Sequence, residues 1–163
     1  LDASHIKVHQ DASNPAGGQT AQAMGRTKGG LNTKLLAWVD ARGRAVQVSL
    51  AAGQRADVRA ASEAPWPKQM RATIAVADKG FDSDAFRAQI RQRGCGVCIP
   101  SRSNRHAPAA WHRGYYRQRH KVENFFQRIK RHRRIGTRYE KCDLYFLGFV
   151  QLAAILDWLK RPF

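Results

Sequence analysis

The sequence predicts an α/β fold in which a mixed sheet is flanked by helices. Strand-like segments dominate the first part of the chain, helix and strand then alternate, and helices fill the last part. That order indicates layers of helix packed on a sheet. At 163 residues the chain suits a single domain, 1–163, that can bury a core of its own.

Strands separated by polar turns are expected in the first part of the chain. Three segments have the apolar and β-branched content of strands: 1–9, 31–40 and 44–51. A Gly-rich polar loop, 10–30, joins the first two. The second and third flank the short segment 40–43, and this spacing predicts a hairpin. A short helix over 57–64 is stopped by the prolines that follow it.

Helices become more frequent toward the end of the chain. The expected elements are strands over 72–78 and 96–100, then helices over 84–94, 114–134 and 143–160. The first of these strands is an almost continuous apolar run, which is typical of burial on both faces. Asp82 or Ser83 can cap the helix that follows, and Gly94 can end it. The apolar run 144–159 is too short for a membrane span and is interpreted as a core helix.

The charge balance points to a polyanionic partner. The chain holds 29 Lys and Arg against 12 Asp and Glu, a formal net charge of +17. Solubility requires far less charge, so nucleic acid is the expected partner and a membrane is not. The phosphate-contact candidates are arginines in basic segments: Arg102, Arg105, Arg131, Arg133 and Arg134.

Three cysteines and no signal peptide predict a reducing, cytoplasmic setting. Cys95 and Cys98 have the spacing of half a zinc site. The same segment also fits a buried strand in which cysteine acts as a small apolar residue, and we favour that interpretation.

Three acidic residues occupy positions that a solvated surface does not explain. Asp2 lies in the first strand, Asp78 follows the buried strand, and Glu123 lies in the helix over 114–134. Ligand sites of open α/β sheets lie beyond strand ends. On the helix, Glu123 is about a quarter-turn from the apolar stripe formed by residues 122, 125, 126 and 129. Spacing alone favours equally a functional carboxylate and an ion pair with Arg119.

A family resemblance favours the functional interpretation. The spacing Tyr116-x2-Arg119-x3-Glu123-x6-Lys130 resembles the Y-R-E-K signature of bacterial insertion-sequence transposases with a DDE active site. Other segments resemble the same family along nearly the whole chain: LDASHIKVHQ, GRTKGGLNTKLLAWVDARG, LAAGQRAD, VADKGFDSD, IPSRSNR and RIGTRYEK. In VADKGFDSD, Phe81 stands where the family usually has tyrosine.

The resemblance implies a ribonuclease-H-like fold and a catalytic triad of Asp2, Asp78 and Glu123. These acids would hold two Mg²⁺ or Mn²⁺ ions, which suit carboxylate oxygen. Tyr116, Arg119 and Lys130 would be accessory residues near the transferred phosphate or the DNA end. The family usually has an amino-terminal DNA-binding region ahead of the first strand, and we expect that the chain lacks it.

The expected activity is metal-dependent cleavage at transposon ends and strand transfer into target DNA, in a bacterial cytoplasm close to the nucleoid. A homodimer on DNA is a further expectation. Two alternatives stay open at this point. One is a DNA-binding transposase remnant without chemistry, and the other is a nuclease of the same fold that cuts but does not join.

Overall fold

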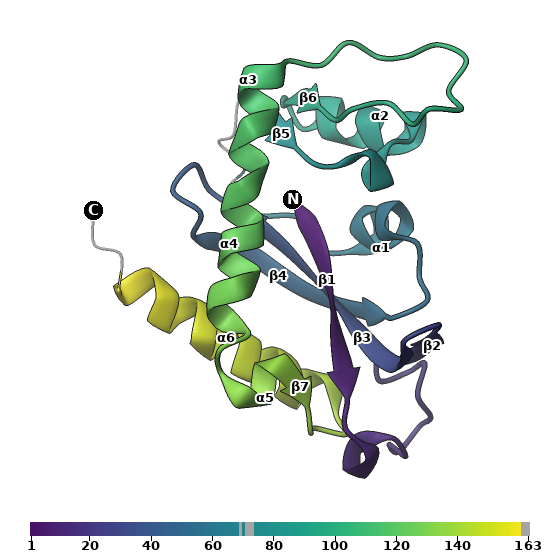
Figure 1. The fold of residues 1–163 in the computed structure, drawn as a ribbon, viewed down its shortest axis with the longest axis vertical. Coiled ribbons are helices and arrows are strands. Elements are labelled where there is room, and N and C mark those ends of the chain that lie inside the picture. Colours follow the sequence, from purple (N-terminus) through teal and green to yellow (C-terminus); the bar gives the residue numbers. More distant parts are fainter. Residues whose placement is uncertain (69, 71–73, 161–163) are drawn as a thin grey trace.

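The computed structural model describes residues 1–68, 70 and 74–160 and contains two sheets with helices packed around them (Figure 1). In chain order the elements are β1 (Asp2–Val8), η1 (Gln10–Ala12), β2 (Gly25–Thr27), β3 (Gly30–Val39), β4 (Ala45–Ala52), α1 (Asp57–Glu63), β5 (Ile74–Val76), η2 (Lys79–Phe81), α2 (Asp84–Gln92), β6 (Gly96–Cys98), α3 (Arg113–Tyr116), η3 (Arg117–Arg119), α4 (His120–Ile129), α5 (Arg133–Gly136), β7 (Thr137–Arg138) and α6 (Asp143–Leu159).

The larger sheet is built on β3. Strands β1 and β4 run antiparallel to β3 along most of its length, and the short β2 pairs with its start. Strand β7 pairs in parallel with the end of β1, so the sheet is mixed. The predicted α/β fold with a mixed sheet between helices is therefore confirmed. Strands β2 and β7 were not predicted, because runs of two or three residues carry no alternation to detect.

Two hydrophobic cores lie on opposite faces of the larger sheet. Alternation along β3 sends Leu35 and Ala37 to one core and Leu36 and Trp38 to the other. The first core is closed by α4 and α6, and the second by α1, α2 and β5. The predicted apolar stripe of α4, residues 122, 125, 126 and 129, is buried in the first core.

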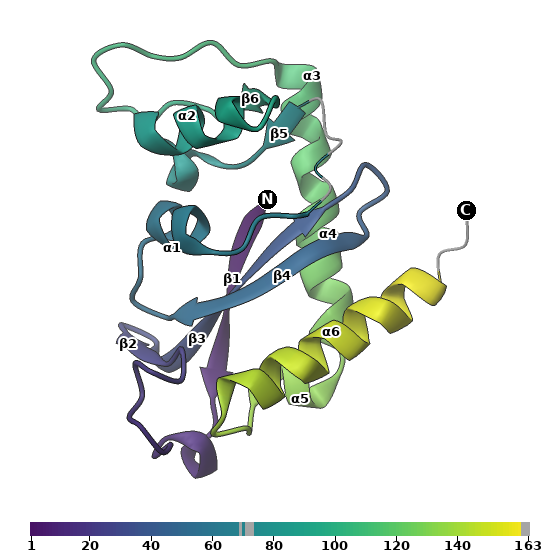
Figure 2. The ribbon, with the colours of Figure 1, turned by 180° about the vertical axis from the view of Figure 1, so that it is seen from behind.

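The second sheet pairs β5 and β6 in parallel. The strand predicted over 72–78 is observed as Ile74–Val76, and residues 72 and 73 lie outside the described part of the chain. The amino group of Leu1 donates to the carbonyl of Val76 at 2.8 Å, so the start of β1 meets the end of β5. Figure 2 shows the small sheet with α2 above the larger one.

The prediction of one helix over 114–134 was wrong at its C-terminal end. Helices α3, η3 and α4 follow one another along one axis, but α4 ends at Ile129 and Lys130 forms its C-cap (Figure 1). The chain then turns into α5, and a Cβ at Gly136 would lie 2.9 Å from the carbonyl oxygen of Lys130. Such a close return of the backbone requires glycine at this position. The last helix, predicted over 143–160, is α6.

Helices α4 and α6 are also joined by an ion pair. The guanidinium of Arg128 donates to both carboxylate oxygens of Asp157, at 2.6 and 2.8 Å, and to the carbonyl of Gly43. No helix in the described residues is long and apolar enough to cross a membrane.

The first core can be tested by truncating one ring. Phe125 is fully buried, so Phe125→Ala should lower the free energy of unfolding by about 3–5 kcal/mol through lost burial and the cavity left behind. The exposed Tyr115 on α3 is the matched aromatic control, and Tyr115→Ala should change it by only about 0.5 kcal/mol. Denaturant unfolding gives both values. Equal losses would contradict the burial of this helix face.

Candidate active site

Asp2 lies on β1 and faces α4. It pairs with Ala37 of β3, and its carboxylate accepts a hydrogen bond from the amide of Ala3 at 2.9 Å. Asp2 and Ser4 share a face of the strand with Ile6, which is buried in the core closed by α4. Only 14% of the Asp2 side chain is exposed. The carboxylate is therefore held at the edge of the core, beneath the helix that carries Glu123.

Arg119 links the first strand to this helix. Its guanidinium contacts the carboxylate of Asp2 at 3.2 Å and also donates to the carboxylate of Glu123, one turn further along. Because one planar guanidinium contacts both, the two carboxylates lie within about 9 Å of each other. The Arg119–Glu123 ion pair and the approach of Glu123 to Asp2, which spacing presented as alternatives, occur together.

Asp78 lies in the turn after β5. Its side chain caps η2 by accepting a hydrogen bond from the amide of Gly80 at 2.7 Å. A Cβ at Gly80 would lie 2.8 Å from the same carboxylate oxygen. Glycine at this position lets the backbone approach the acid, which gives the D-x-G spacing a physical reason.

Asp78 lies close enough to Asp2 for its charge to affect the pKa of Asp2. The contact between Leu1 and Val76 brings together the two chain segments that carry them. Burial raises the pKa of Asp2 and the charge of Asp78 adds to the rise, while the Ala3 amide and Arg119 oppose it. Two carboxylates in one partly buried place destabilise each other unless a cation lies between them.

Lys130 and Tyr116 lie at the two ends of the same helical segment. The ammonium of Lys130 donates to the hydroxyl of Ser4 at 2.6 Å and to the carbonyl of His5 at 3.1 Å, and burial lowers its pKa. Arg119 lies over the Tyr116 ring at 5.9 Å, and Trp111 meets that ring edge-on at 5.2 Å. Lys130 and Arg119 therefore contact β1, while Tyr116 packs on Arg119 from α3.

Arg102 and Arg105, expected to contact DNA phosphate, make contacts inside the protein. Arg102 donates to the carbonyls of Lys79 and Gly80, at 3.1 and 2.8 Å, and so holds the turn that carries Asp78. Arg105 contacts the carboxylates of Asp82 and Asp84. These contacts join residues 20 or more positions apart, and nothing in the local sequence indicates them.

Asp82 is the centre of this network. Its carboxylate accepts from the buried Arg87 at 2.9 Å, from Arg105 at 2.8 Å and from the amide of Arg102 at 2.9 Å. Burial alone would raise the pKa of Asp82, but these hydrogen bonds and the two guanidinium charges outweigh it and lower the pKa. Asp82 was expected only as a possible helix cap. The cap is Ser83, whose hydroxyl accepts from the amide of Phe86.

The other three arginines expected to contact DNA phosphate follow α4 in the chain and lie on the surface. Arg131, Arg133 and Arg134 are all exposed. Arg133 lies over the ring of Tyr139, and Arg134 contacts Glu140 at 2.9 Å. This group is continuous with the end of α4 that carries Lys130 (Figure 1).

A metal would have to enter a site where a guanidinium now serves as the cation. Within residues 1–68, 70 and 74–160, no three His, Cys, Asp or Glu side chains are grouped to hold an ion. The donor chemistry nevertheless fits: Asp2, Asp78 and Glu123 offer carboxylate oxygens, which Mg²⁺ and Mn²⁺ prefer. Burial raises the pKa of Asp2, and the nearby charge of Asp78 raises it further, so a cation beside Asp2 would stabilise its ionised form.

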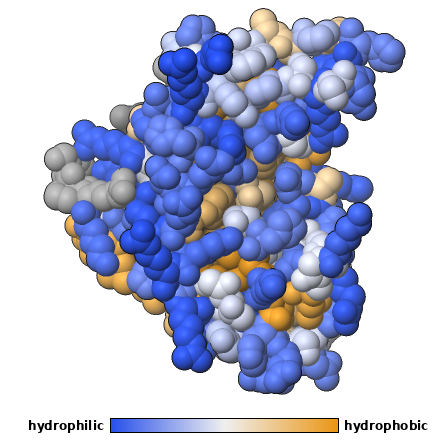
Figure 3. Space-filling view, in the orientation of Figure 1, coloured by the Kyte–Doolittle hydropathy of each residue, from blue (hydrophilic) through white to orange (hydrophobic). Residues whose placement is uncertain are grey.

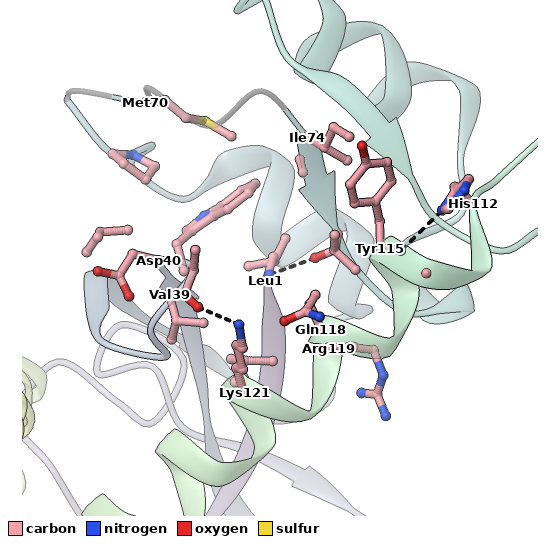
Figure 4. Close-up of a pocket in the computed structure, with 18 residues that line it drawn as sticks. Leu1, Val39, Asp40, Met70, Ile74, His112, Tyr115, Gln118, Arg119 and Lys121 are labelled. Carbon is pink, nitrogen blue, oxygen red and sulfur yellow. Dashed lines mark hydrogen bonds between the residues drawn. The ribbon is translucent and has the colours of Figure 1, made fainter.

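An apolar pocket beside the start of β1 is a separate feature. It has a volume of about 870 Å³, lies beside Leu1 and is lined mostly by apolar side chains of β3, β5 and α3. Figure 4 shows Met70, Ile74 and Tyr115 around it, while the Arg119 side chain points away. None of the three candidate acids lines the pocket. Its chemistry does not suit phosphate or a metal, and the acids, on the Arg119 side, form the candidate site.

Comparisons with known proteins agree on one family. The family described as Transposase DDE domain matches residues 75–160. The chain is also similar to the transposase assigned to insertion sequence element IS6501 of Brucella ovis, with 34% identity over 134 residues. That alignment covers 80% of this chain and 100% of the relative. No solved structure is significantly similar to the chain.

The Asp82 network gives a pH-dependent prediction. Because the folded-state pKa of Asp82 is lowered below its ordinary 3.8, the ionised carboxylate stabilises the fold above that pH. Asp82→Asn should lower the free energy of unfolding at pH 7 by about 3–5 kcal/mol, since it leaves the buried guanidinium of Arg87 without its acidic partner. The difference from the unsubstituted protein should vanish as pH falls through the lowered pKa.

Asp84→Asn is the matched control, because the Asp84 side chain is 86% exposed and contacts the same Arg105. It should change stability at pH 7 by less than about 1 kcal/mol. Urea unfolding measured between pH 7 and pH 3 would check both variants. A loss for Asp82→Asn that does not depend on pH would contradict the electrostatic explanation.

Proposed function

Because the chain belongs to the DDE transposases of insertion sequences, we propose that it cleaves DNA at the ends of a mobile element and joins the freed end to target DNA. The observation that carries the proposal is the contact of one guanidinium with Asp2 and Glu123, which lie on different elements. Nothing local forces these acids together, so the fold itself assembles them. The contact of Leu1 with Val76, near Asp2 and Asp78 in the chain, supports including Asp78 in the proposed site.

We also interpret the fold as ribonuclease-H-like. Three features support this interpretation: the antiparallel strands β1, β3 and β4, the contact between the start of β1 and the end of β5, and the helix bearing Glu123 packed beside β1. Each candidate acid then comes from a different element. Such a site forms only in the folded chain.

Asp2, Asp78 and Glu123 are the residues proposed to hold divalent metal ions, which DDE domains generally use. When bound, two such ions activate a water or a 3′-hydroxyl and stabilise the leaving oxygen of an in-line displacement. The three carboxylates would supply the negative charge that retains the ions. The depth of Asp2 in the core fixes its position, and the Gly80 amide fixes that of Asp78.

The neighbouring cations are proposed to balance charge and to contact phosphate. Arg119 neutralises Asp2 and Glu123 in the structure, and on binding of metal its guanidinium would be released toward a DNA phosphate. Lys130 is held by Ser4, two residues from Asp2 on the same strand face, and offers a second positive charge. Tyr116 would hold Arg119 from the side opposite β1.

DNA is proposed to lie along the basic surface that continues from α4. Arg131, Arg133 and Arg134 are exposed and suited to phosphate contacts. Arg102 is also exposed, so it keeps this role beside its contacts to the Asp78 turn. Arg105 is better assigned to positioning, because its nitrogens contact Asp82, Asp84 and the carbonyl of Ala107.

The chemistry is tested by removing one carboxylate. Glu123→Gln should lower cleavage and strand transfer by at least about 1,000-fold, because a neutral amide binds a divalent ion poorly. Binding to the same DNA should be unchanged or tighter, since one negative charge is lost. The measurement is cleavage and joining of labelled element ends with Mg²⁺ or Mn²⁺, together with a mobility-shift assay.

Glu63→Gln on α1 makes the same chemical change at an exposed position and should leave activity intact. Undiminished cutting by Glu123→Gln, or cutting in excess EDTA, would overturn the site assignment. An unsubstituted chain that binds element ends yet neither cuts nor joins them would indicate the non-catalytic remnant. Cutting without joining would indicate the nuclease.

The basic surface predicts a steep dependence of DNA binding on salt. With a net charge of +17 and contacts to roughly six phosphates, the slope of log K against log[salt] for generic duplex should be near −5. Fluorescence anisotropy between low and moderate salt measures it. Arg131→Gln should make the slope shallower by about 1. A slope near zero would mean that the charge serves another partner.

A further inference from the structure

Helix α6 carries a large apolar face that the rest of the chain leaves exposed. The sequence predicts a core helix here, but only one face of the helix is buried. The apolar side chains on that face are Phe146, Val150, Ala153 and Ala154. On the other half, Tyr145, Leu152 and Leu159 are 72%, 59% and 73% exposed. Along Asp143–Leu159, all described by the structure, Gln151 is the one fully polar side chain among the exposed positions. The expectation of a core helix is thus wrong for half of its surface.

The exposed residues repeat with the spacing that pairs helices. Tyr145, Phe149, Leu152, Leu156 and Leu159 are separated by 4, 3, 4 and 3 positions and form one seam, here named the α6 seam. Alternation of 3 and 4 is the spacing at which two helices pack side by side. Figure 2 shows α6 crossing the outside of the molecule with no other element over it, and Figure 3 shows apolar residues at the edge where α6 runs.

The area of this face is that of a protein interface. The exposed apolar side chains of α6 together leave roughly 800 Å² accessible, whereas the largest apolar patch of a monomer is usually about 300–600 Å². One partner in a specific complex buries about 800 Å².

Charge narrows the choice of partner. One cation reaches the α6 seam: Arg134 lies over the ring of Phe149 at 4.7 Å, and its charge is compensated by Glu140, so the seam does not offer a row of free cations to DNA. Most other surfaces of a chain with net charge +17 repel a second copy, and this neutral face does not. The nearby cation Arg134 is paired with Glu140, and the carboxylate of Asp157 with Arg128.

The first and last residues of the seam are equally far from its middle residue. Leu152 lies seven positions from both Tyr145 and Leu159, so two antiparallel copies would place Leu152 against Leu152 and Tyr145 against Leu159. Asp143 begins the helix and Lys160 follows its last residue, so the same arrangement brings opposite charges together at each end. A parallel arrangement would bring like charges and like helix dipoles together.

We infer that a second copy of this chain covers the α6 seam, in an antiparallel, two-fold symmetric dimer centred on Leu152. The dimer forms through apolar contact, so it exists without DNA and persists at high salt. It would hold two candidate active sites in one particle, each on the α4 side of its own sheet.

The test is the mass in solution of the full chain, measured by sedimentation equilibrium in 0.5 M salt over a range of concentrations. The unsubstituted chain should approach twice the mass of one chain. Leu152→Glu should weaken association by at least about 100-fold, because two unpaired carboxylates would meet on the symmetry axis. Gln151→Glu adds the same charge to the same helix beside the seam and should leave the dimer intact.

Cysteine cross-linking tests the orientation in a Cys142→Ser background. Leu152→Cys should form an intermolecular disulfide under mild oxidation. Tyr145→Cys alone should not, but Tyr145→Cys combined with Leu159→Cys should. A monomer at all concentrations, or a dimer that Leu152→Glu leaves unchanged, would overturn the inference. Efficient cross-linking by Tyr145→Cys alone would overturn the antiparallel arrangement.

Discussion

The pairing of β1 with β3 is the constraint on which the site depends. Strand β3 is buried on both faces, and its alternating side chains divide the interior into two cores. Pairing of Asp2 with Ala37 orients β1 so that Asp2, Ser4 and Ile6 face α4. A slip of one residue would turn Asp2 into the other core and carry Leu1 toward Arg119. The hydrophobic pattern that stabilises the sheet therefore also directs the carboxylate of Asp2 toward α4.

Electrostatic compensation is the second theme of the structure. Asp2 and Glu123 are partly buried and share one guanidinium, and Arg119 offsets part of the free-energy cost of placing two carboxylates near each other. Charge compensation of the same kind occurs at Asp82, whose carboxylate forms ion pairs with the guanidinium groups of Arg87 and Arg105. That network and Arg102 hold the turn of Asp78. Some arginines of this basic chain thus stabilise its fold by pairing with acidic side chains and backbone carbonyls, and others are left to contact nucleic acid.

The distribution of charge separates two kinds of surface. The exposed arginines after α4 suit a polyanion, and the apolar seam of α6 suits another protein surface. These surfaces belong to elements that pack on the same face of the sheet and are joined by the Arg128–Asp157 pair.

The sequence by itself determined the local elements, because their signals are local. The hairpin of β3 and β4, the cap at Ser83, the apolar stripe of α4 and the last helix all follow from periodicity and turn chemistry. The resemblance to DDE transposases supplied Asp2, Asp78 and Glu123 as candidates, and spacing on the helix alone left Glu123 ambiguous. Only the tertiary structure decided that Arg119 contacts two acids, that Arg102 and Arg105 also contact the chain around Asp78 and Asp82, and that half of α6 is exposed. These outcomes depend on contacts between residues far apart in the chain, which local patterns do not specify.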